Sequence, residues 1–498
     1  MSLDAVLKSV SRWSNSIWKW LKQRPKRSIS SLMLIAHLLG AYTAVRVIME
    51  HRSPQGATAW AGALVTIPYV AVPAYWFFGK SDFNGYKSAR ESADDSFDHI
   101  YEEWLGSLPE EDLSAEDIDD RFAVLEKLVG MPFTKGNNVE LLVDGEESFK
   151  AVFETLESAK DYILVQYYTI EDDQLGRKLQ QRLIAKAEMG INVYVLYDEV
   201  GSSGLGSSYL KPLKDAGVVI RPFSSNIDDV VDFRLNFRNH RKMIVADGLV
   251  AVSGGCNVGD AYMGRDPDFG HWRDTNVRVR GPIVQALQVA FAEDWRWVTQ
   301  KKLQGLCWTC PRDSGGEVRA LCLPMGPAGK LETCALFHHA MIAAAKKRLW
   351  IASPYFVPDM PIVTGLQLAA LRGVDVRILI PDETDSTLVN LSMHTYFQTM
   401  EEAGVKVYRY QKGFLHQKVV LVDDDFASVG TANFDNRSFH LNFEVNVAVQ
   451  DKDFASKVAA MLEEDLDHCI PVSAKTFQEK GFFFRFAAHV SRLLAPIQ

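Results

Sequence analysis

The sequence contains few cysteines and has no excess of positive charge. Six cysteines in 498 residues are too few for a disulfide scaffold. The 54 Lys and Arg residues are outnumbered by 63 Asp and Glu residues, which gives a formal net charge of −9. An acidic total argues against a dedicated nucleic-acid-binding protein, because such proteins depend on cations that neutralise phosphates. A mean hydropathy of −0.07 excludes a polytopic transporter but permits one or two membrane spans.

Metal-binding cysteine patterns are also scarce. Cys307 and Cys310 form a CxxC pair, which is typical of half a zinc site or of a redox pair. No second CxxC and no HxxxH follows at metal-binding spacing. We therefore expect reduced thiols, and we predict neither a metal ion nor a cofactor.

The composition that is present belongs to a packed globular chain. Hydrophobic residues make up 47% and charged residues 23%, which excludes wholesale disorder and collagen-like or low-complexity classes. The length alone indicates about three domains of roughly 150 residues each.

The first eighty residues depart most from this average. Segment 1–27 mixes tryptophans and isoleucine with seven cations and one acid, Asp4, and predicts a basic amphipathic helix in the headgroup region. Two uncharged runs follow, Ser28–Val45 and Ala57–Gly79, and each has about the ~20 residues needed to span a bilayer. We therefore predict two transmembrane helices within 28–80.

Two buried core helices or a signal peptide are the alternatives to these spans. Two prolines in the second run, Pro68 and Pro73, disfavour a soluble core helix, and a signal peptide would not be followed so soon by another span. Cations before the first run and after the second, at Lys80, Lys87 and Arg90, place both ends of the pair in the cytoplasm by the positive-inside rule. Everything after Gly79 is then expected on the cytoplasmic side of the membrane.

The rest of the chain contains an internal repeat. Apolar strands and amphipathic helices follow in the same order after residues 159 and 345, as expected of βαβ units. The predicted fold is α/β: a two-helix transmembrane hairpin followed by a duplicated domain, each half a mainly parallel sheet flanked by helices, with the active site between the halves. The predicted segments are an acidic connector at 81–135, a first half at 136–305, a second half at 306–480 and an amphipathic C-terminal segment at 481–498.

The repeat becomes chemically specific near the end of each half. Both halves contain an HxKxxxxD motif on an alternating strand, so that the His and Lys point to the same face. An asparagine follows each His by seventeen residues. The motif residues are His240, Lys242, Asp247 and Asn257 in the first half, and His416, Lys418, Asp423 and Asn433 in the second.

This set of residues suits phosphodiester chemistry. One neutral imidazole can attack phosphorus and form a phosphohistidine, while a second, protonated imidazole protonates the departing alkoxide. Two lysines and two asparagines supply donors to the phosphoryl oxygens, where charge builds in the transition state. Since one motif supplies only one histidine, the duplication is part of the predicted mechanism.

The motifs and the sequence around them resemble the phospholipase D superfamily, and more closely the bacterial cardiolipin synthases. The likeness rests on RNHRKMIVADG, SGGCNVGDAY and HWRDTNVRVRG in the first half and on SPYFVPD, FLHQKVVLVDD and VGTANFDNRSFHLNFEVN in the second. The membrane hairpin and SPQGATAW before its second run also resemble that family. One departure is Asn276, where the family more often has histidine.

The resemblance implies a role for each matching position. His240 corresponds to the nucleophile and His416 to the general acid and base. The two lysines and two asparagines correspond to phosphate-binding positions. Asp274 and Glu444 correspond to acids that orient the histidines, and the motif aspartates organise the site.

The implied reaction transfers a phosphatidyl group between two phosphatidylglycerol molecules and releases glycerol. Hydrolysis of phospholipid remains open, because water and an alcohol would attack the same phosphohistidine. Phosphatidylethanolamine also remains open as a donor of the phosphatidyl group. A nuclease and a catalytically silent lipid-binding scaffold are further alternatives. The implied partners are phosphatidylglycerol, other membrane phospholipids and the bilayer, with no nucleic acid; the oligomeric state is left open. The C-terminal segment, with aromatics beside Arg485 and Arg492, predicts a helix on the membrane surface or, equally, one packed on the core.

Overall fold

The computed structural model describes residues 25–50, 54–79, 94–109, 113, 118–223, 237–309, 316–329 and 331–498. It divides into two compact units, each described by itself. The N-terminal unit consists of Met1–Asp82 with Val230–Asn236, and the large unit of Phe83–Asp229 with Phe237–Gln498. The predicted interfacial segment at 1–27, apart from its last three residues, and Cys310 lie outside the described residues.

The N-terminal unit contains one long apolar helix, α2 (Pro25–Glu50). Its segment Ser30–Met49, of 20 residues with a mean hydropathy of 1.8, is the one helix in the described part of the chain that is long and apolar enough to cross a membrane. The second predicted run folds as shorter pieces: α3 (Pro54–Thr66), α4 (Pro68–Ala74) and a π-helical turn, η1 (Tyr75–Gly79). The break falls at Ile67 because Pro68 has no N–H to donate and its ring crowds the preceding turn.

These pieces pack against α2. A buried apolar cluster joins Ala44 and Val47 of α2 to Leu64 and Val72. Gly40 allows close approach, because a Cβ at that position would lie 2.2 Å from the carbonyl oxygen of Leu64. The two uncharged runs therefore form a packed helical pair whose outer face on α2 is exposed and apolar.

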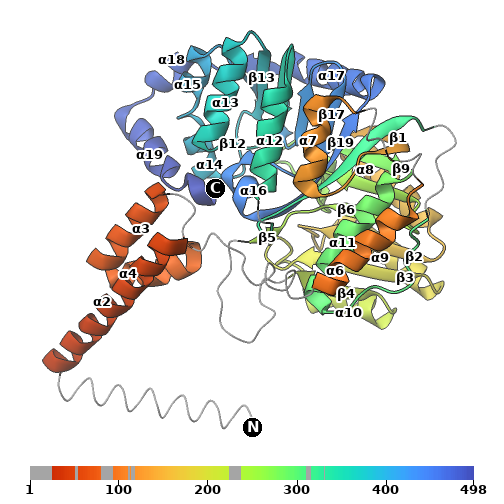
Figure 1. Cartoon of the computed structure of the whole chain (residues 1–498), viewed down its shortest axis with the longest axis horizontal. Helices are drawn as coiled ribbons and strands as arrows, with labels where there is room; N and C mark the ends of the chain where they lie inside the picture. Colours follow the sequence, from red (N-terminus) through yellow and green to blue (C-terminus); the bar gives the residue numbers. More distant parts are fainter. Residues whose placement is uncertain are drawn as a thin grey trace. The chain divides into compact units, whose positions relative to one another are not determined.

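The large unit is built on one sheet of 16 strands that runs through both halves (Figure 1). The order is β20-β14-β13-β11-β16-β17-β19-β10-β1-β9-β7-β6-β2-β3-β4, with β5 paired to β19. The first half contains β1 (Thr134–Val143), α8 (Asp144–Ser158), β2 (Tyr162–Tyr167), α9 (Gln174–Glu188), β3 (Asn192–Asp198), α10 (Ser207–Asp215), β4 (Val219–Phe223), β5 (Arg238–Asn239), β6 (Met243–Ala246), β7 (Val250–Gly254), η3 (Asp260–Met263), β8 (Trp272–Arg273), β9 (Thr275–Arg280) and α11 (Ile283–Thr299).

The second half repeats this order and extends it. It contains β10 (Val318–Met325), α12 (Thr333–Ala344), β11 (Arg348–Ala352), β12 (Phe356–Val357), α13 (Met360–Leu371), β13 (Asp375–Pro381), α14 (Thr387–Met393), α15 (Phe397–Glu402), β14 (Lys406–Tyr410), β15 (Phe414–Leu415), β16 (Val419–Val422), β17 (Phe426–Gly430), β18 (Phe434–Asp435), α16 (Asn436–His440), β19 (Asn442–Gln450), α17 (Lys452–Asp467), β20 (Cys469–Pro471), α18 (Ala474–Gln478), α19 (Phe482–Arg492) and η4 (Ala495–Ile497). The predicted duplication of an α/β domain is confirmed, and β1 pairs with β10 to join the halves.

The prediction of a mainly parallel sheet in each half is wrong. Along the path of the main sheet, parallel pairing is confined to β2-β3-β4 and to β11-β13-β14, and the remaining neighbours are antiparallel. Off this path, the two-residue strand β5 lies parallel to β19. The reason is the length of the connections. Parallel neighbours need a long crossover, which α9 and α10 supply in the first half, whereas β6 and β7 are joined by a tight turn and must form a hairpin.

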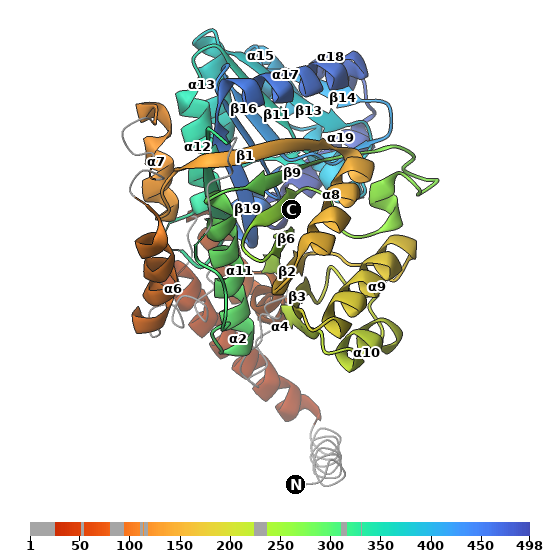
Figure 2. The same cartoon turned by 90° about the vertical axis from the view of Figure 1, so that its right-hand side faces the viewer.

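Side chains alternate across the strands into two apolar layers. On β2, Leu164 belongs to the cluster that includes α11, whereas Ile163 and Val165 belong to the cluster that includes α8 and α9. Figure 2 shows α11 and α6 on one side of these strands and α8 and α9 on the other. Because both faces are buried, the strands appear in the sequence as continuous apolar runs.

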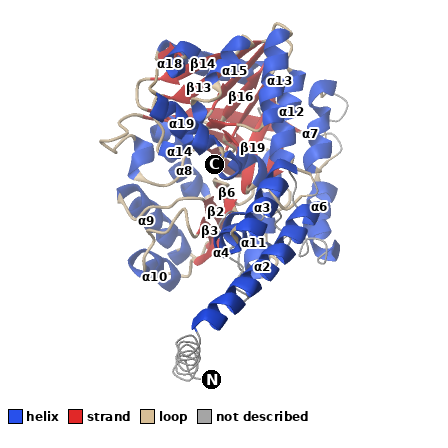
Figure 3. Ribbon diagram, turned by 90° about the vertical axis from the view of Figure 1, so that its left-hand side faces the viewer, coloured by secondary structure: helices blue, strands red, loops and turns tan. Residues whose placement is uncertain are grey.

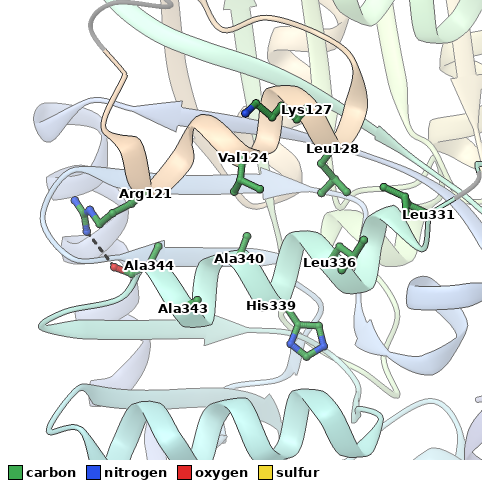
Figure 4. Close-up of a pocket in the computed structure, with 10 residues that line it drawn as sticks. All are labelled: Arg121, Val124, Lys127, Leu128, Leu331, Leu336, His339, Ala340, Ala343 and Ala344. Carbon is green, nitrogen blue, oxygen red and sulfur yellow. Dashed lines mark hydrogen bonds between the residues drawn. The ribbon is translucent and has the colours of Figure 1, made fainter.

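Two helices from the acidic segment 81–135 belong to this core. These are α6 (Asp94–Ser107), which buries Ile100 and Trp104, and α7 (Asp120–Val129), which buries Phe122 and Leu125. Between α7 and α12 runs an apolar groove of about 590 Å³, and Arg121 at its end donates to the carbonyl of Ala344 at 3.2 Å (Figure 4). The acidic segment therefore adds two packed helices to the large unit.

Candidate active site

The two motif histidines follow two-residue strands that pair with the opposite half. The strand before His240, β5, lies parallel to the start of β19, and the strand before His416, β15, lies parallel to β8. The backbone N–H of His240 donates to the carbonyl of Phe443 at 2.8 Å, and that of His416 to the carbonyl of Arg273 at 2.7 Å. Each histidine is thus fixed by backbone from the other half.

Each histidine also takes its carboxylate partner from the other half. His240 Nδ1 lies 2.8 Å from Glu444 Oε2, and His416 Nδ1 lies 2.7 Å from Asp274 Oδ2. Both carboxylates are completely buried. With Nδ1 donating to a carboxylate, Nε2 of each ring keeps its lone pair for chemistry.

Glu444 is held by several further donors. Its carboxylate accepts from Thr431 Oγ1 at 2.6 Å, from Ser438 Oγ at 2.9 Å and from Asn442 Nδ2 at 3.1 Å. Burial alone would raise the pKa of Glu444, but the charges and hydrogen bonds of His240 and its other neighbours lower it overall. The carboxylate is therefore ionised and holds His240 in one orientation.

Lys242 and Lys418 complete the charged centre. Both are buried, and Lys242 Nζ donates to the carbonyl of His240 at 2.8 Å, as Lys418 Nζ does to the carbonyl of His416. Burial lowers the pKa of Lys242 to about 7 and that of Lys418 to about 8, against the opposing charges of Glu444 and Asp274. Each lysine is thus held beside its motif histidine, with a pKa below the ordinary lysine value.

Burial also keeps both imidazoles neutral in the empty site. It lowers the pKa of His240 to about 4, and burial with the charge on Lys418 lowers that of His416 to about 3. Lys418 also lowers the pKa of His240, and Lys242 that of His416, so the charges of the two halves act on each other. The structure therefore brings both motifs into one site.

The two predicted phosphate-binding asparagines lie in different surroundings. Asn257 Oδ1 accepts from the backbone N–H of Thr169 at 3.1 Å, and its Nδ2 donates to Tyr262 Oη at 2.7 Å. The backbone N–H of Asn433 donates to Ser438 Oγ at 3.1 Å. Both side chains are buried beside the histidine and lysine strands.

The motif aspartates lie at the other end of their strands and bind backbone. Asp247 accepts from the N–H groups of Lys160, Asp161 and Tyr162 at 2.7 to 2.9 Å. Asp423 accepts from three consecutive N–H groups in the same way at 2.7 to 3.2 Å, from Lys346, Lys347 and Arg348. Both adopt a left-handed backbone, with φ of 53° and 52°. They fix the starts of β2 and β11.

Sequence reasoning did not assign a role to Asn276. Its Oδ1 accepts the backbone N–H of Cys256 at 3.1 Å, directly before Asn257. Asn446 does the same for the N–H of Thr431 in the second half, also at 3.1 Å. Asn276 follows Asp274 by two residues, and Asn446 follows Glu444 by two residues. This repeated spacing was the sign in the sequence that the two asparagines have equivalent roles.

Sequence reasoning also missed the anchors of the residue between each His and Lys. Arg241 forms an ion pair of 3.0 Å with buried Asp294 on α11, and Gln417 Nε2 donates to Asp465 on α17 at 2.6 Å. These contacts tie each motif strand to the helix that closes its half. Among the described residues, no group of three His, Cys, Asp or Glu side chains is arranged to hold a metal ion.

Aromatic rings line both histidines. Tyr168 meets the His240 ring edge-on at 4.9 Å between centroids, and Tyr262 meets His416 at 5.9 Å. Trp272 also packs against His416, at 5.1 Å. These rings restrict the orientation of the imidazoles.

Comparison with known proteins agrees with this duplicated site. The family model described as "Cardiolipin synthase, PLD-like domain" matches residues 152–295 and 339–466, one stretch in each half, and the model "Phospholipase_D-nuclease N-terminal" matches residues 38–80. The large unit thus has a phospholipase D-like fold. A solved structure, phosphatidylserine synthase from Haemophilus influenzae Rd KW20, is similar in fold, with a TM-score of 0.58 and 15% identity, over 76% of this chain and 100% of that one.

Two curated relatives are similar over nearly the whole chain. Cardiolipin synthase A from Pseudomonas putida (strain F1) is 43% identical over 470 residues, which cover 94% of this chain and 98% of the relative. Cardiolipin synthase A from Pseudomonas aeruginosa (strain LESB58) is 43% identical over 488 residues, covering 96% and 98%. The chain therefore belongs to the phospholipase D-like cardiolipin synthase family.

Proposed function

We propose that this protein makes cardiolipin by transferring a phosphatidyl group from one phosphatidylglycerol molecule to another, with release of glycerol. The observation that carries the proposal is the pair of imidazoles, each held by a buried carboxylate from the opposite half, beside two buried lysines. Family membership supports the identity of the product.

In the first step, neutral His240 attacks the phosphorus of phosphatidylglycerol through Nε2. The P–O bond to the glycerol headgroup breaks as the P–N bond forms, and His416 gives its proton to the departing glycerol oxygen. Glu444 balances the positive charge that develops on the His240 ring. Lys242, Lys418 and the two asparagines bind the phosphoryl oxygens.

His416 must gain its proton when substrate binds. In the empty site, burial and the charge on Lys418 keep it neutral. A phosphodiester between the lysines brings a negative charge that offsets theirs, and this raises the pKa of His416 toward the ordinary value. Asp274 at 2.7 Å then stabilises the imidazolium.

In the second step, a hydroxyl of another phosphatidylglycerol attacks the phosphohistidine. His416 removes the hydroxyl proton, the P–N bond breaks, and cardiolipin leaves with both imidazoles restored. Water in place of this alcohol would give phosphatidic acid, so product analysis distinguishes transfer from hydrolysis.

We further propose that the N-terminal unit anchors the enzyme in the bacterial inner membrane with two spans and that the large unit lies on the cytoplasmic side. Supporting observations are the candidate span Ser30–Met49, the apolar pieces from Pro54 to Gly79 packed on it, and the cations at both flanks. Cysteine labelling from either side of sealed vesicles tests the topology, with a cysteine introduced at Gly56 in the first turn of α3 and at Lys301 in the large unit.

The decisive experiment supplies full-length protein in liposomes with phosphatidylglycerol, with and without phosphatidylethanolamine, and follows the products by mass spectrometry. We expect cardiolipin and glycerol. Phosphatidic acid as the main product would show a hydrolase, and ethanolamine release would add phosphatidylethanolamine as a donor.

The same assay tests the two histidines. His240→Ala and His416→Ala should each lower turnover by about 10³-fold or more, because each removes a group that acts in both steps. His339→Ala, in the groove between α7 and α12, is the matched control and should retain activity. Substantial turnover in either catalytic variant would refute the two-histidine scheme.

A further inference from the structure

Helix α19 has an apolar face that the large unit leaves uncovered. Phe482, Phe483, Phe486, Val490 and Leu493 are exposed, and their spacing places them along one side of the helix and its end. Phe483 is 85% exposed and Leu493 is 78% exposed. Single exposed apolar residues are ordinary on soluble surfaces, but a contiguous aromatic patch marks an interaction site.

The opposite face fixes the helix to the large unit. Ala488 and Ser491 are buried, and Ser491 Oγ donates to the carbonyl of Leu388 at 2.7 Å and lies 3.0 Å from Ser392 Oγ. Figure 3 shows α19 beside α14, which carries both of these partners. The exposed phenylalanines are therefore not needed to hold the helix in place.

Cations flank the aromatic face of α19. From Lys480 to Gln498 the sequence contains Lys480, Arg485 and Arg492 and no Asp or Glu. Lys480 and Arg485 are exposed, and the Arg492 guanidinium lies 4.4 Å from the Tyr396 ring. Apolar side chains flanked by cations complement the acyl boundary and the headgroups of an anionic bilayer.

The end of this segment contacts α16, the short helix that follows Asn433 and β18. Beyond α19, the backbone carbonyl of Gln498 accepts the N–H of Arg437 at 2.8 Å, and Gln498 Nε2 donates to the carbonyl of Ser491 at 2.9 Å. Arg437 belongs to α16, and Ser438 on the same helix binds both Glu444 and the backbone of Asn433. The segment after α19 is thus linked to Asn433, a proposed phosphate-binding residue, through α16: Gln498 binds Arg437, and Ser438 binds the backbone of Asn433.

We propose that α19 docks the large unit on an anionic phospholipid bilayer, with Phe482, Phe483 and Phe486 inserted at the acyl boundary and Lys480 and Arg485 against the headgroups. This inference rests on the proposed function, which requires both substrates to reach the site from a bilayer.

Photocrosslinking of the full-length enzyme in liposomes tests the contact. Benzoylphenylalanine at position 483 should crosslink to lipid, with a higher yield in phosphatidylglycerol vesicles than in phosphatidylcholine vesicles. The same group at Leu371, which is exposed on α13 of the same half, is the control and should give little lipid adduct. Crosslinking of position 483 to a second protein chain would overturn the proposal in favour of a self-association surface.

Kinetics separate this proposal from the function on which it rests. The variant F482S/F483S/F486S should lose on the order of tenfold or more turnover in vesicles dilute in phosphatidylglycerol, and keep its turnover in mixed detergent micelles. L368S/L371S, on α13, should behave as wild type in both. Equal vesicle rates for the triple variant and wild type would refute docking by α19. Failure of wild type to make cardiolipin in micelles would instead refute the proposed function.

Discussion

Four titratable side chains at the centre of the site owe their behaviour to burial. His240, His416, Lys242 and Lys418 all have lowered pKa values, although each lies near a carboxylate that opposes the shift. Desolvation disfavours the cation, and two lysines in one site repel each other and any added proton. Before substrate binds, both imidazoles are therefore neutral. The negative charge of the proposed phosphodiester substrate would stabilise the charged form of the two lysines.

This electrostatic balance predicts a pH profile for kcat/KM, which reports the free enzyme. The proposed nucleophile must be neutral and His416 must be protonated for the first step, so kcat/KM should be highest near their pKa values of about 4 and about 3 and should decline at higher pH. The lysines must be charged, so this decline should become steeper as the pH rises through the Lys242 and Lys418 values of about 7 and about 8.

Lys242→Arg provides the control for that assignment. Arginine stays charged throughout this range, so the alkaline limb should move upward, toward the Lys418 value of about 8, even if the maximal rate is lower. An alkaline limb unchanged in this variant would show that Lys242 does not produce it.

At this scale the sequence predicted which residues form the candidate site, because residue identity and spacing are what a repeated motif records. It did not show which acid serves which histidine, since β5 and β15 are only two residues long and leave no periodic signal. The role of Asn276 was also out of reach, because a side chain that accepts one buried N–H has no pattern of its own.

At the scale of elements, α7 joins the acidic segment to the second motif. Arg121 on α7 donates to Asp423 Oδ2 at 2.6 Å, and Asp423 holds the start of β11. Phe122, the next residue, stacks on Phe426 of β17 with centroids 4.1 Å apart. The first-half aspartate, Asp247, makes the equivalent backbone bonds to the start of β2.

We therefore predict that Arg121→Met lowers the free energy of unfolding by about 1–2 kcal/mol, because it removes a mostly buried partner while Asp423 keeps its backbone donors. Thermal unfolding in detergent measures the effect. Lys347→Met removes an exposed ion pair with Asp424 and should leave the unfolding midpoint unchanged. Equal midpoints for Arg121→Met and wild type would contradict the role given to Arg121.

Element boundaries and strand direction were the weaker part of the sequence prediction. Runs such as Val419–Val422 are apolar throughout because both faces are buried, and that pattern is the same for parallel and antiparallel strands. The Asp247-Gly248 pair between β6 and β7 was the available sign of a hairpin. In the N-terminal unit, Pro68 divides the second uncharged run into helices too short to qualify as spans by themselves.

At the scale of the whole molecule, one chain contains every residue of the site. Each histidine depends on a carboxylate from the other half, and β1, β10 and β19 make the sheet continuous. A single large unit is therefore sufficient for the proposed chemistry, whatever the oligomeric state.

Co-expression of His240→Ala chains with His416→Ala chains tests this statement. Because neither chain has a complete pair of histidines, the mixture should be as inactive as each variant alone in the liposome assay. Wild type co-expressed with either variant should retain the wild-type share of activity. Recovery of turnover in the mixture of the two variants would show that sites form between chains.

Each histidine is paired with a carboxylate from the opposite half of the chain, and this has a consequence for the order in which the site is synthesised. Glu444 follows His240 by 204 residues, so the nucleophile is synthesised long before the group that orients it. A nascent or truncated chain that has folded only its first half carries His240 without its acid, and Asp274 without the histidine it serves. Under the proposed mechanism such a chain lacks His416 and the acid that orients His240, so we expect a chain that ends before Glu444 to be inactive in the liposome assay.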